Sequence, residues 1–391
     1  MAHRLVTADW VYPISSQRIR HGVVVLDGNK VIAVEQRNHV PADQLEYHKG
    51  IIIPGFINTH CHLELSHLEG KVASGTTLLP FLEQVVQQRE SSKEIIDTAI
   101  TQADAYMWEQ GIQAVGDISN KTDTFAVKRL SKISYYNFVE VFDYRQGERM
   151  KGLIDRNLQT YDEAPSPKAI VPHAPYSVSE ELFAKIKSLN APASTICIHN
   201  QETAAEEELF KSGTGDFFPF FEKFNFHMGD FPGTGQSSIH FVLQHLDPNQ
   251  RTLFVHNTLT SKADIGAAQS WSEKVYWATC PNANLYIENR LPNYQYFLDD
   301  ASRMTIGTDS LSSNWQLSIL EEMKTIAKYQ SYVSFDTLLR WATLNGAEAL
   351  GMVKELGSIE TGKTPGLILL SMDPEKEKIS DEHVRVTRLC P

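Results

Sequence analysis

Short apolar runs alternate with stretches of helical spacing along most of this 391-residue chain, and this alternation limits the possible folds more than any other feature. Eight runs are interpreted as β-strands: 51–58, 113–118, 133–142, 168–173, 194–199, 252–256, 274–279 and 303–308. Amphipathic patterns between them predict helices, for example at 91–110, 179–189, 203–211 and 314–329. Such alternation is typical of a parallel α/β sheet, and eight repeats favour a (β/α)8 TIM barrel over an open, doubly wound sheet.

The two ends of the chain have a different pattern. The apolar runs 23–26 and 30–34 flank Asp27-Gly28-Asn29, whose turn chemistry predicts a β-hairpin. The segment 357–370 lacks a helical period and is rich in glycine, threonine and β-branched residues. We therefore expect residues 1–50 and 357–391 to form one small β-sandwich domain, and residues 51–356 to form the barrel.

Composition narrows the class of partner. The chain has 36 basic and 48 acidic residues, and its formal charge of -12 has the wrong sign for binding nucleic acid or an anionic membrane. No apolar run approaches the roughly 18 residues that a membrane span needs, and the start of the chain lacks the apolar stretch of a signal peptide. We expect a cytoplasmic protein with a small-molecule substrate. The pattern leaves open whether the chain forms a homo-oligomer.

Metal-ligand residues fall where predicted strands end. His60 and His62 close the first strand, where alternation directs both side chains to one side and Cys61 into packing. This H-x-H pair alone is a weak indication, but three more strand ends carry ligand types: His199, His256 and Asp309. The four cysteines form no C-x-x-C pair, which excludes a thiolate zinc knuckle. Because barrel strands open onto one face at their carboxyl ends, we expect these side chains to converge there.

This constellation resembles the amidohydrolase superfamily. The run Ile53-Pro54-Gly55-Phe56-Ile57-Asn58-Thr59-His60 is similar to the family's entry into its first strand, and the run 357–363 is similar to its closing β-domain. Pro365-Gly366 departs from the family by replacing an acidic residue there. The resemblance covers nearly the whole chain and implies one divalent metal ion with four ligands: His60, His62, His199 and Asp309. Zinc is the expected ion, and the same ligands accept iron or manganese.

A second metal is the alternative that we considered. Dinuclear members of the superfamily bridge two ions with a carboxylated lysine on the fourth strand. Lys168 lies at the wrong end of that strand, so a single metal is inferred. Glu140, at the end of the third strand, is the residue that would bridge a second ion.

A glutamate follows the fifth-strand histidine with the spacing H-x-x-E, which resembles the deaminase and chlorohydrolase branch of the superfamily. This resemblance implies that Glu202 shuttles protons. It also implies that Asp309 accepts the proton of the attacking water and that His256 orients the nucleophile and stabilises charge. The alternative for Glu202 is a helix-opening residue favoured by the helix dipole. Three glutamates follow it, which we assign to a solvated helix face: Glu206, Glu207 and Glu208.

Four residues are candidates for substrate binding. His173 lies in a His-Ala-Pro-Tyr turn that presents a histidine to substrate in the superfamily; capping of this turn is the alternative. Glu64 continues the alternation of the first strand, unless strand geometry ends at His62. Arg149, together with Arg145, follows the third strand and would pair with a substrate carboxylate, with surface ion pairing as the alternative.

The runs 62–66, 79–82 and 173–176 are most similar to the aminodeoxyfutalosine deaminases of menaquinone biosynthesis. This resemblance implies a hydrolytic deaminase that replaces the amino group of an aminopurine nucleoside with oxygen and releases ammonia. The alternatives are a chlorohydrolase, a hydrolase of cyclic amides or other carbon–nitrogen bonds, and a non-catalytic binding protein.

The segment 217–231 holds seven of the 18 phenylalanines and follows the fifth predicted strand. It is much longer than an ordinary βα loop. We expect either a substrate lid or a self-packed extension at the side of the barrel.

Overall fold

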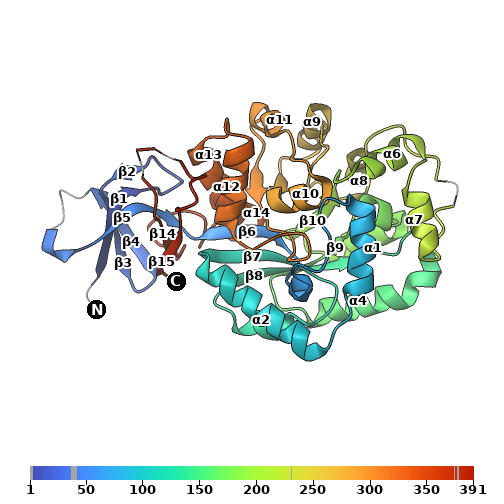
Figure 1. Ribbon diagram of the computed structural model, residues 1–391, viewed down its shortest axis with the longest axis horizontal. Helices are drawn as coiled ribbons and strands as arrows, with labels where there is room; N and C mark the ends of the chain where they lie inside the picture. The colour runs from blue at the N-terminus through green and yellow to red at the C-terminus, as the bar shows by residue number, and fades with distance from the viewer. Residues whose placement is uncertain (1–2, 37–41, 230, 374, 377) are drawn as a thin grey trace.

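The computed structural model describes residues 3–36, 42–229, 231–373, 375–376 and 378–391. Residue 230 of the phenylalanine-rich segment and parts of the two predicted end segments therefore lie outside the description. Figure 1 shows a small sheet at one end of an elongated molecule, with both chain ends beside it and the other strands and helices making up the rest. None of the helices within these ranges is long and apolar enough to cross a membrane.

The predicted strands form two four-stranded parallel sheets. The first contains β6 (Phe56–Cys61), β7 (Ile112–Ser119), β8 (Ser134–Val141) and β9 (Lys168–Pro172). The second contains β10 (Thr195–Asn200), β11 (Arg251–His256), β12 (Val275–Thr279) and β13 (Met304–Ile306). Backbone hydrogen bonds link the two sheets at both edges, from the His199 amide to the His173 carbonyl and from the Asp309 amide to the His60 carbonyl, both at 3.0 Å. The parallel α/β architecture is confirmed, and these links bring the strand ends that carry candidate residues together.

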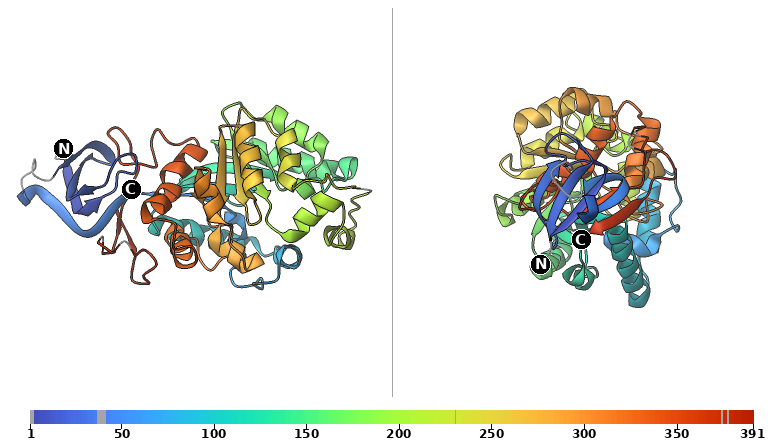
Figure 2. Two further views of the ribbon diagram at one scale, coloured as in Figure 1. Left: turned by 90° about the horizontal axis from the view of Figure 1, so that it is seen from above. Right: turned by 90° about the vertical axis from the view of Figure 1, so that its left-hand side faces the viewer.

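Helices connect the parallel strands and surround them in Figure 2. Their bounds are α1 (Leu78–Gln88), α2 (Lys93–Glu109), α3 (Phe125–Leu130), α4 (Lys151–Glu163), α5 (Glu180–Leu189), α6 (Ala204–Ser212), α7 (Phe217–Lys223), α8 (Ser238–His245), α9 (Lys262–Trp271), α10 (Pro281–Glu288), α11 (Tyr294–Asp299), α12 (Ile319–Tyr329), α13 (Phe335–Ala342) and α14 (Leu344–Ala349). The Ser92 and Ser179 side chains cap α2 and α5 by accepting backbone hydrogen bonds. The four helices predicted above correspond to α2, α5, α6 and α12.

The two ends of the chain meet in one sheet. Its strands are β1 (Arg4–Val11), β2 (Ile19–Arg20), β3 (Gly22–Asp27), β4 (Lys30–Gln36), β5 (Leu45–Pro54), β14 (Leu367–Leu370) and β15 (Val386–Cys390). The predicted hairpin is the antiparallel pair β3 and β4. A separate cluster of buried residues, including Val6, Ile52 and Leu367, forms the core of this unit. The structure describes one seven-stranded sheet here, and its arrangement as a β-sandwich domain stays a prediction.

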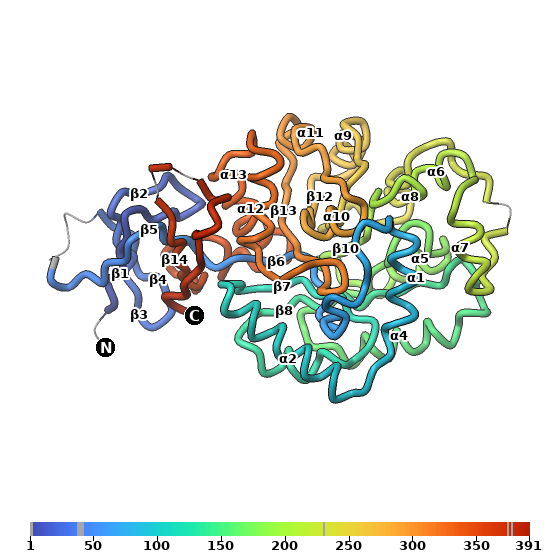
Figure 3. Tube along the Cα trace, viewed as in Figure 1, coloured from blue at the N-terminus to red at the C-terminus, as the bar shows by residue number. Residues whose placement is uncertain are grey.

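The predicted strand 51–58 is two strands that belong to different sheets. Residues 51–54 end β5 and pair with β14, whereas Phe56 begins β6 and pairs with Ile112 of β7. The chain changes sheets at Gly55, where an added Cβ would lie 2.9 Å from the Gln113 Cβ and 3.0 Å from the Pro365 carbonyl oxygen. Only glycine allows this close approach. Figure 3 traces the passage from the small sheet into β6.

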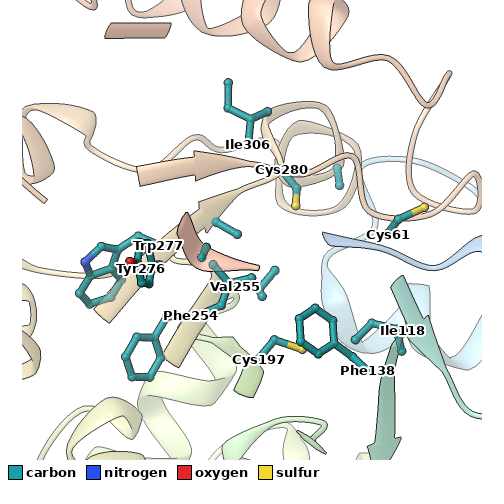
Figure 4. Close-up of a cluster of buried hydrophobic side chains, with 14 of the residues drawn as sticks. Cys61, Ile118, Phe138, Cys197, Phe254, Val255, Tyr276, Trp277, Cys280 and Ile306 are labelled. Carbon is teal, nitrogen blue, oxygen red and sulfur yellow. The ribbon is translucent and has the colours of Figure 1, made fainter. Parts of the chain in front are cut away.

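The core of the parallel sheets contains many of the residues of the predicted strands. Figure 4 shows Phe138, Cys197 and Trp277 among the buried side chains, with Cys61 nearby. Cys61 is fully buried, as the strand alternation predicts. All four cysteines are buried and free, so they contribute to packing and not to disulfide bonds.

Candidate active site

A cavity of about 390 Å³ lies at the carboxyl ends of the parallel strands. Part of its lining is polar: His62, His173, His199, Glu202, His256 and Asp309. The rest is largely apolar and aromatic, supplied by α1 and by the segment around α7: Leu78, Phe81, Leu82, Phe220, Phe224 and Phe226. A polar centre beside an aromatic wall suits a planar, partly polar small molecule.

Three histidine nitrogens and one carboxylate oxygen converge at this face. The Nε2 atoms of His60 and His62 are 3.1 Å apart, and those of His62 and His199 are 3.3 Å apart. The Asp309 Oδ1 atom lies 3.6 Å from His60 Nε2 and 3.4 Å from His62 Nε2. Four ligands at about 2.0–2.1 Å from a tetrahedral zinc ion stand roughly 3.3–3.4 Å from one another. These four separations fit a metal ion. The three histidines form one cluster of possible ligands, and Asp309 forms an adjoining cluster with His60 and His256.

Electrostatics keep these donors ready for a cation. Burial is the main reason that the pKa of His60 falls to about 4 and that the pKa of His62 lies well below its usual value. Burial alone would raise the pKa of Asp309, but a hydrogen bond from His60 and the neighbouring His62 and His256 lower it below the ordinary value. At neutral pH His60 and His62 are thus neutral and Asp309 is ionised, which are the metal-binding forms.

Hydrogen bonds to neighbouring residues fix the orientation of His199 and Asp309. The His199 Nδ1 atom lies 2.8 Å from the His173 carbonyl oxygen, which leaves Nε2 free to bind a metal. Ser313 donates a hydrogen bond to the Asp309 Oδ2 atom at 2.6 Å, so Oδ1 is the oxygen presented to the histidines. Asp309 also has a φ of +58°, a left-handed conformation that non-glycine residues rarely adopt.

Glu202 and His256 adjoin this cluster. Their Oε1 and Nε2 atoms are 3.6 Å apart, and both side chains are buried. Burial raises the pKa of Glu202 to about 8, so the carboxyl group can hold a proton at neutral pH. The His256 Nδ1 atom lies 2.9 Å from the Asn284 side-chain oxygen and donates its proton there, which leaves the Nε2 lone pair facing the site.

Glu140 stands on the other side of His199. Its Oε1 atom lies 3.5 Å from Nδ1 of that histidine, and its Oε2 atom accepts a hydrogen bond from Asn120 at 3.0 Å. The histidine cluster uses the opposite ring nitrogen. Glu140 therefore does not join the four-donor group, although with His173 and His199 it forms a second cluster of possible ligands.

The candidate substrate-binding residues have different surroundings. His173 lines the cavity, and its Nδ1 atom lies 2.7 Å from the Ser177 hydroxyl, which is a contact within the turn. Substrate binding by His173 stays a prediction. Strand β6 ends at Cys61, and Glu64 lies in a 3₁₀ helix where its carboxylate binds Arg89 and the amides of residues 120 and 121. Glu64 is not part of the cavity lining.

Neither predicted arginine reaches the cavity. Arg149 donates to the Gln146 side chain and to the Asn225 carbonyl, and Arg145 lies over the rings of Phe231 and Phe241. Among the described residues, Arg89 is the one arginine or lysine in the lining. It follows α1, outside any motif, so the sequence offered no indication of it.

The chain is similar to known proteins along most of its length. Residues 51–387 match the model of a family described as the amidohydrolase family. The aminodeoxyfutalosine deaminase of a Nitratiruptor species is 26% identical over 348 residues, which are 86% of this chain and 82% of that protein.

Two solved structures illustrate the likeness in fold. Aminofutalosine deaminase of Helicobacter pylori, in complex with methylthio-coformycin, has a TM-score of 0.84 and 21% identity, covering 98% of this chain and 97% of its own. Atrazine chlorohydrolase of Arthrobacter aurescens, complexed with zinc, has a TM-score of 0.76 and 17% identity, covering 99% and 95%. At these identities the structures establish the shared fold, and they include both a deaminase and a chlorohydrolase.

Proposed function

The chain belongs to the amidohydrolase family, and we propose that it is a metal-dependent deaminase that converts an aminopurine nucleoside to its oxo form and releases ammonia. It is a hydrolase of carbon–nitrogen bonds. The proposed substrate is a 6-aminopurine nucleoside with a carboxylated 5′ group, of the aminodeoxyfutalosine type. The two parallel sheets are proposed to form one (β/α)8 barrel that carries this site.

One observation carries the proposal: Glu202, a buried carboxyl group with a pKa raised to about 8, lies beside the four-donor cluster in the same cavity. Deamination needs a proton on the ring nitrogen and, later, on the departing amine. A carboxyl group that holds a proton near neutral pH can give it to the ring nitrogen, and the proton that Asp309 takes from the water can then go to the departing amine.

Four residues would hold the metal: His60, His62, His199 and Asp309. A divalent ion bound by these residues would supply Lewis-acid chemistry that makes hydroxide available at neutral pH. Asp309 presents one oxygen to this centre and can take up the proton that the water loses. His256 directs its Nε2 lone pair at the same point and orients the nucleophile by accepting a hydrogen bond. Zinc is the proposed ion, with iron and manganese as the other candidates.

The lining of the cavity supports the proposal that the substrate is a nucleoside with a large 5′ substituent. Aromatic side chains from α1 and from the segment around α7 line one part of it, next to the polar centre. Arg89 adds a guanidinium that can bind a carboxylate. A purine over the polar centre would thus leave its substituent against the aromatic wall. His173, at the polar end, is the proposed contact to the nucleoside.

The direct test is release of ammonia by metal-loaded protein from a panel of aminated purines and nucleosides, including a 5′-carboxylated nucleoside, free adenine and guanine. We expect the carboxylated 6-aminopurine nucleoside to react best. Glu202→Gln should keep its metal, measured by elemental analysis, and lose turnover by about 10² or more. Loss of metal in this variant would make Glu202 structural. Preference for a free base, or reaction with triazine chlorides alone, would contradict the nucleoside proposal.

A further inference from the structure

Glu206 is buried, although it belongs to a run of three glutamates that the sequence pattern assigns to a solvated helix face. Its side chain on α6 is 1% exposed, whereas Glu208 on the same helix is exposed. The prediction of a solvated face is therefore wrong for Glu206. A buried carboxyl group needs hydrogen-bond partners, and three groups donate to the oxygens of this one.

Two of these donors belong to the backbone just before α6. The Gln201 amide donates to Oε1 of Glu206 at 3.0 Å, and the Glu202 amide donates to Oε2 at 3.2 Å. The third donor is the Ser238 hydroxyl of α8, 2.5 Å from Oε1. The carboxyl group thus binds two consecutive peptide groups with its two oxygens.

The peptide groups that it binds form the turn that carries Glu202. Gln201 has a φ of +48°, in the left-handed region that a glutamine rarely occupies. Such a conformation persists only where surrounding contacts hold it. The Gln201 carbonyl accepts a hydrogen bond from the Leu259 amide at 3.0 Å, and Glu206 holds the two amides.

We propose that Glu206 is a positioning residue for the reaction: by binding the amides of Gln201 and Glu202, it fixes the turn that aims the Glu202 carboxyl group into the cavity. Glu206 does not line the cavity and acts only through this turn. The inference rests on the proposed function for the role of Glu202, but the contact with the turn can be tested without activity.

The first test is backbone hydrogen exchange, followed by mass spectrometry of peptides that cover residues 200–203. In Glu206→Gln the amide group has one acceptor and one donor, so one of the two backbone amides loses its partner. We expect these amides to exchange about tenfold faster or more, since exchange follows local opening. Glu208→Gln is the matched control, because it makes the same change on the exposed side of α6. Unchanged exchange in Glu206→Gln would overturn the proposal.

The second test is kinetic and uses ammonia release from the best substrate of the panel. We expect Glu206→Gln to lower kcat by about 10- to 100-fold, because a displaced catalytic group loses its orientation. KM, metal content and the melting temperature should stay close to those of Glu208→Gln. In the Glu202→Gln background, Glu206→Gln should cause no further loss, because both changes remove the same contribution. Independent, additive losses would show that Glu206 acts elsewhere and would overturn the proposal.

A conservative variant guards against loss of folding. Glu206→Asp keeps the carboxyl group but draws its oxygens back from the turn, so it should also lower kcat and speed exchange at residues 200–203. Unchanged kcat in a folded variant with faster exchange would overturn the positioning role. If the wild-type protein releases no ammonia from any substrate, the proposed function fails, and the exchange experiment still decides whether Glu206 holds the turn.

Discussion

Asp309 offers only one carboxylate oxygen to the histidine cluster, because Ser313 hydrogen-bonds to the other. His256 is oriented in a similar way, since Asn284 accepts its Nδ1 proton and leaves Nε2 facing the site. In each case a hydrogen bond with a second residue occupies one polar atom of the side chain and leaves the other atom facing the site. The geometry of the site therefore depends on Ser313 and Asn284 as well as on Asp309 and His256. Substitutions of Ser313 or Asn284 should affect the chemistry too.

The pH profile of kcat should report the protonation of Glu202. The pKa of this carboxyl group is raised to about 8 by burial, and the protonated form is the one that donates to the substrate. We therefore expect kcat to hold through neutral pH and to fall as pH rises through the pKa. A cation at the histidine cluster shifts this fall toward lower pH, while burial keeps it above the ordinary range of glutamate. A kcat that shows no fall up to about pH 10 would contradict the assigned role, since that lies well above the raised pKa.

Arg89 should determine the preference for an anionic substituent. Replacing Arg89 with Met alone would leave the buried Glu64 carboxylate without its ion pair, so the variant to make is Arg89→Met with Glu64→Gln. A charged hydrogen bond contributes about 1.5–3 kcal/mol, so kcat/KM for a carboxylated nucleoside should fall roughly 10- to 100-fold. Adenosine, which lacks the carboxylate, should be affected much less.

Arg149→Met is the matched control for this experiment, because Arg149 lies outside the cavity. An equal loss of kcat/KM for adenosine and for the carboxylated nucleoside would show that Arg89 supports the site generally and does not bind the carboxylate.

The sequence indicated the metal-ligand candidates but could not identify the residues that depend on distant contacts. His60, His62 and Asp309 could be predicted from the sequence because each lies at the end of a recognisable strand. The carboxyl ends of barrel strands lie on one face of the barrel. The sequence around Glu206 does not distinguish it from an exposed glutamate. The contacts of its carboxyl group come from the turn before α6 and from Ser238 of another helix. Arg89 enters the cavity because α1 ends there, which no local pattern encodes.

At the scale of elements, the predicted strands agree with the structure to within a few residues, except at the first. The strand predicted over 51–58 is divided at Gly55, because a continuous apolar run cannot reveal that its two halves pair with different sheets. The helix predicted from 314 begins at Ile319. Asn314 instead donates to the Thr308 carbonyl and to Glu322, and these bonds hold the preceding residues in a loop beside Asp309.

The phenylalanine-rich segment combines the two expected alternatives. Phe217 and Phe221 are buried in the protein core, as in a self-packed extension. Phe224 and Phe226 line the cavity, as residues of a substrate-covering element would. Phe226 also stacks on Tyr144, with ring centroids 4.4 Å apart and an angle of 19° between the planes.

Phe226→Ala should therefore raise KM for nucleosides with a bulky aromatic 5′ group. An aromatic contact contributes about 0.5–1.5 kcal/mol, which corresponds to a roughly 2- to 12-fold change in KM. Adenosine should respond less, because it has no such group to place against the ring. Phe218→Ala is the control, since Phe218 is in the same segment but not in the cavity lining. Equal effects of both variants on all substrates would assign the segment to folding alone.

At the scale of the whole molecule, the C-terminal strand ties the small sheet to the parallel sheets. Arg388 of β15 reaches across to the residues around the end of α2 and the start of β7. Its guanidinium donates to the carbonyls of Trp108 and Ile112 and to the Gln113 side chain, at 2.8–3.1 Å. The guanidinium carbon also lies 3.5 Å from the centre of the Trp108 ring. Burial lowers the pKa of Arg388 to about 10, which still leaves it charged at neutral pH.

Loss of this contact should lower stability without changing the chemistry of the folded site, because Arg388 belongs to the small sheet and does not line the cavity. Arg388→Ala removes these hydrogen bonds and the contact with the Trp108 ring, and we expect the free energy of unfolding to fall by about 2–4 kcal/mol. Arg388→Lys should recover only part of it, since an ammonium group cannot reproduce the planar set of donors. Urea unfolding of both variants measures the loss, with Arg385→Ala, an exposed neighbour in the same segment, as the control.

The kcat/KM of each variant, per folded molecule, should equal that of the wild type. A fall in kcat/KM at full stability would instead mean that the small sheet shapes the active site directly.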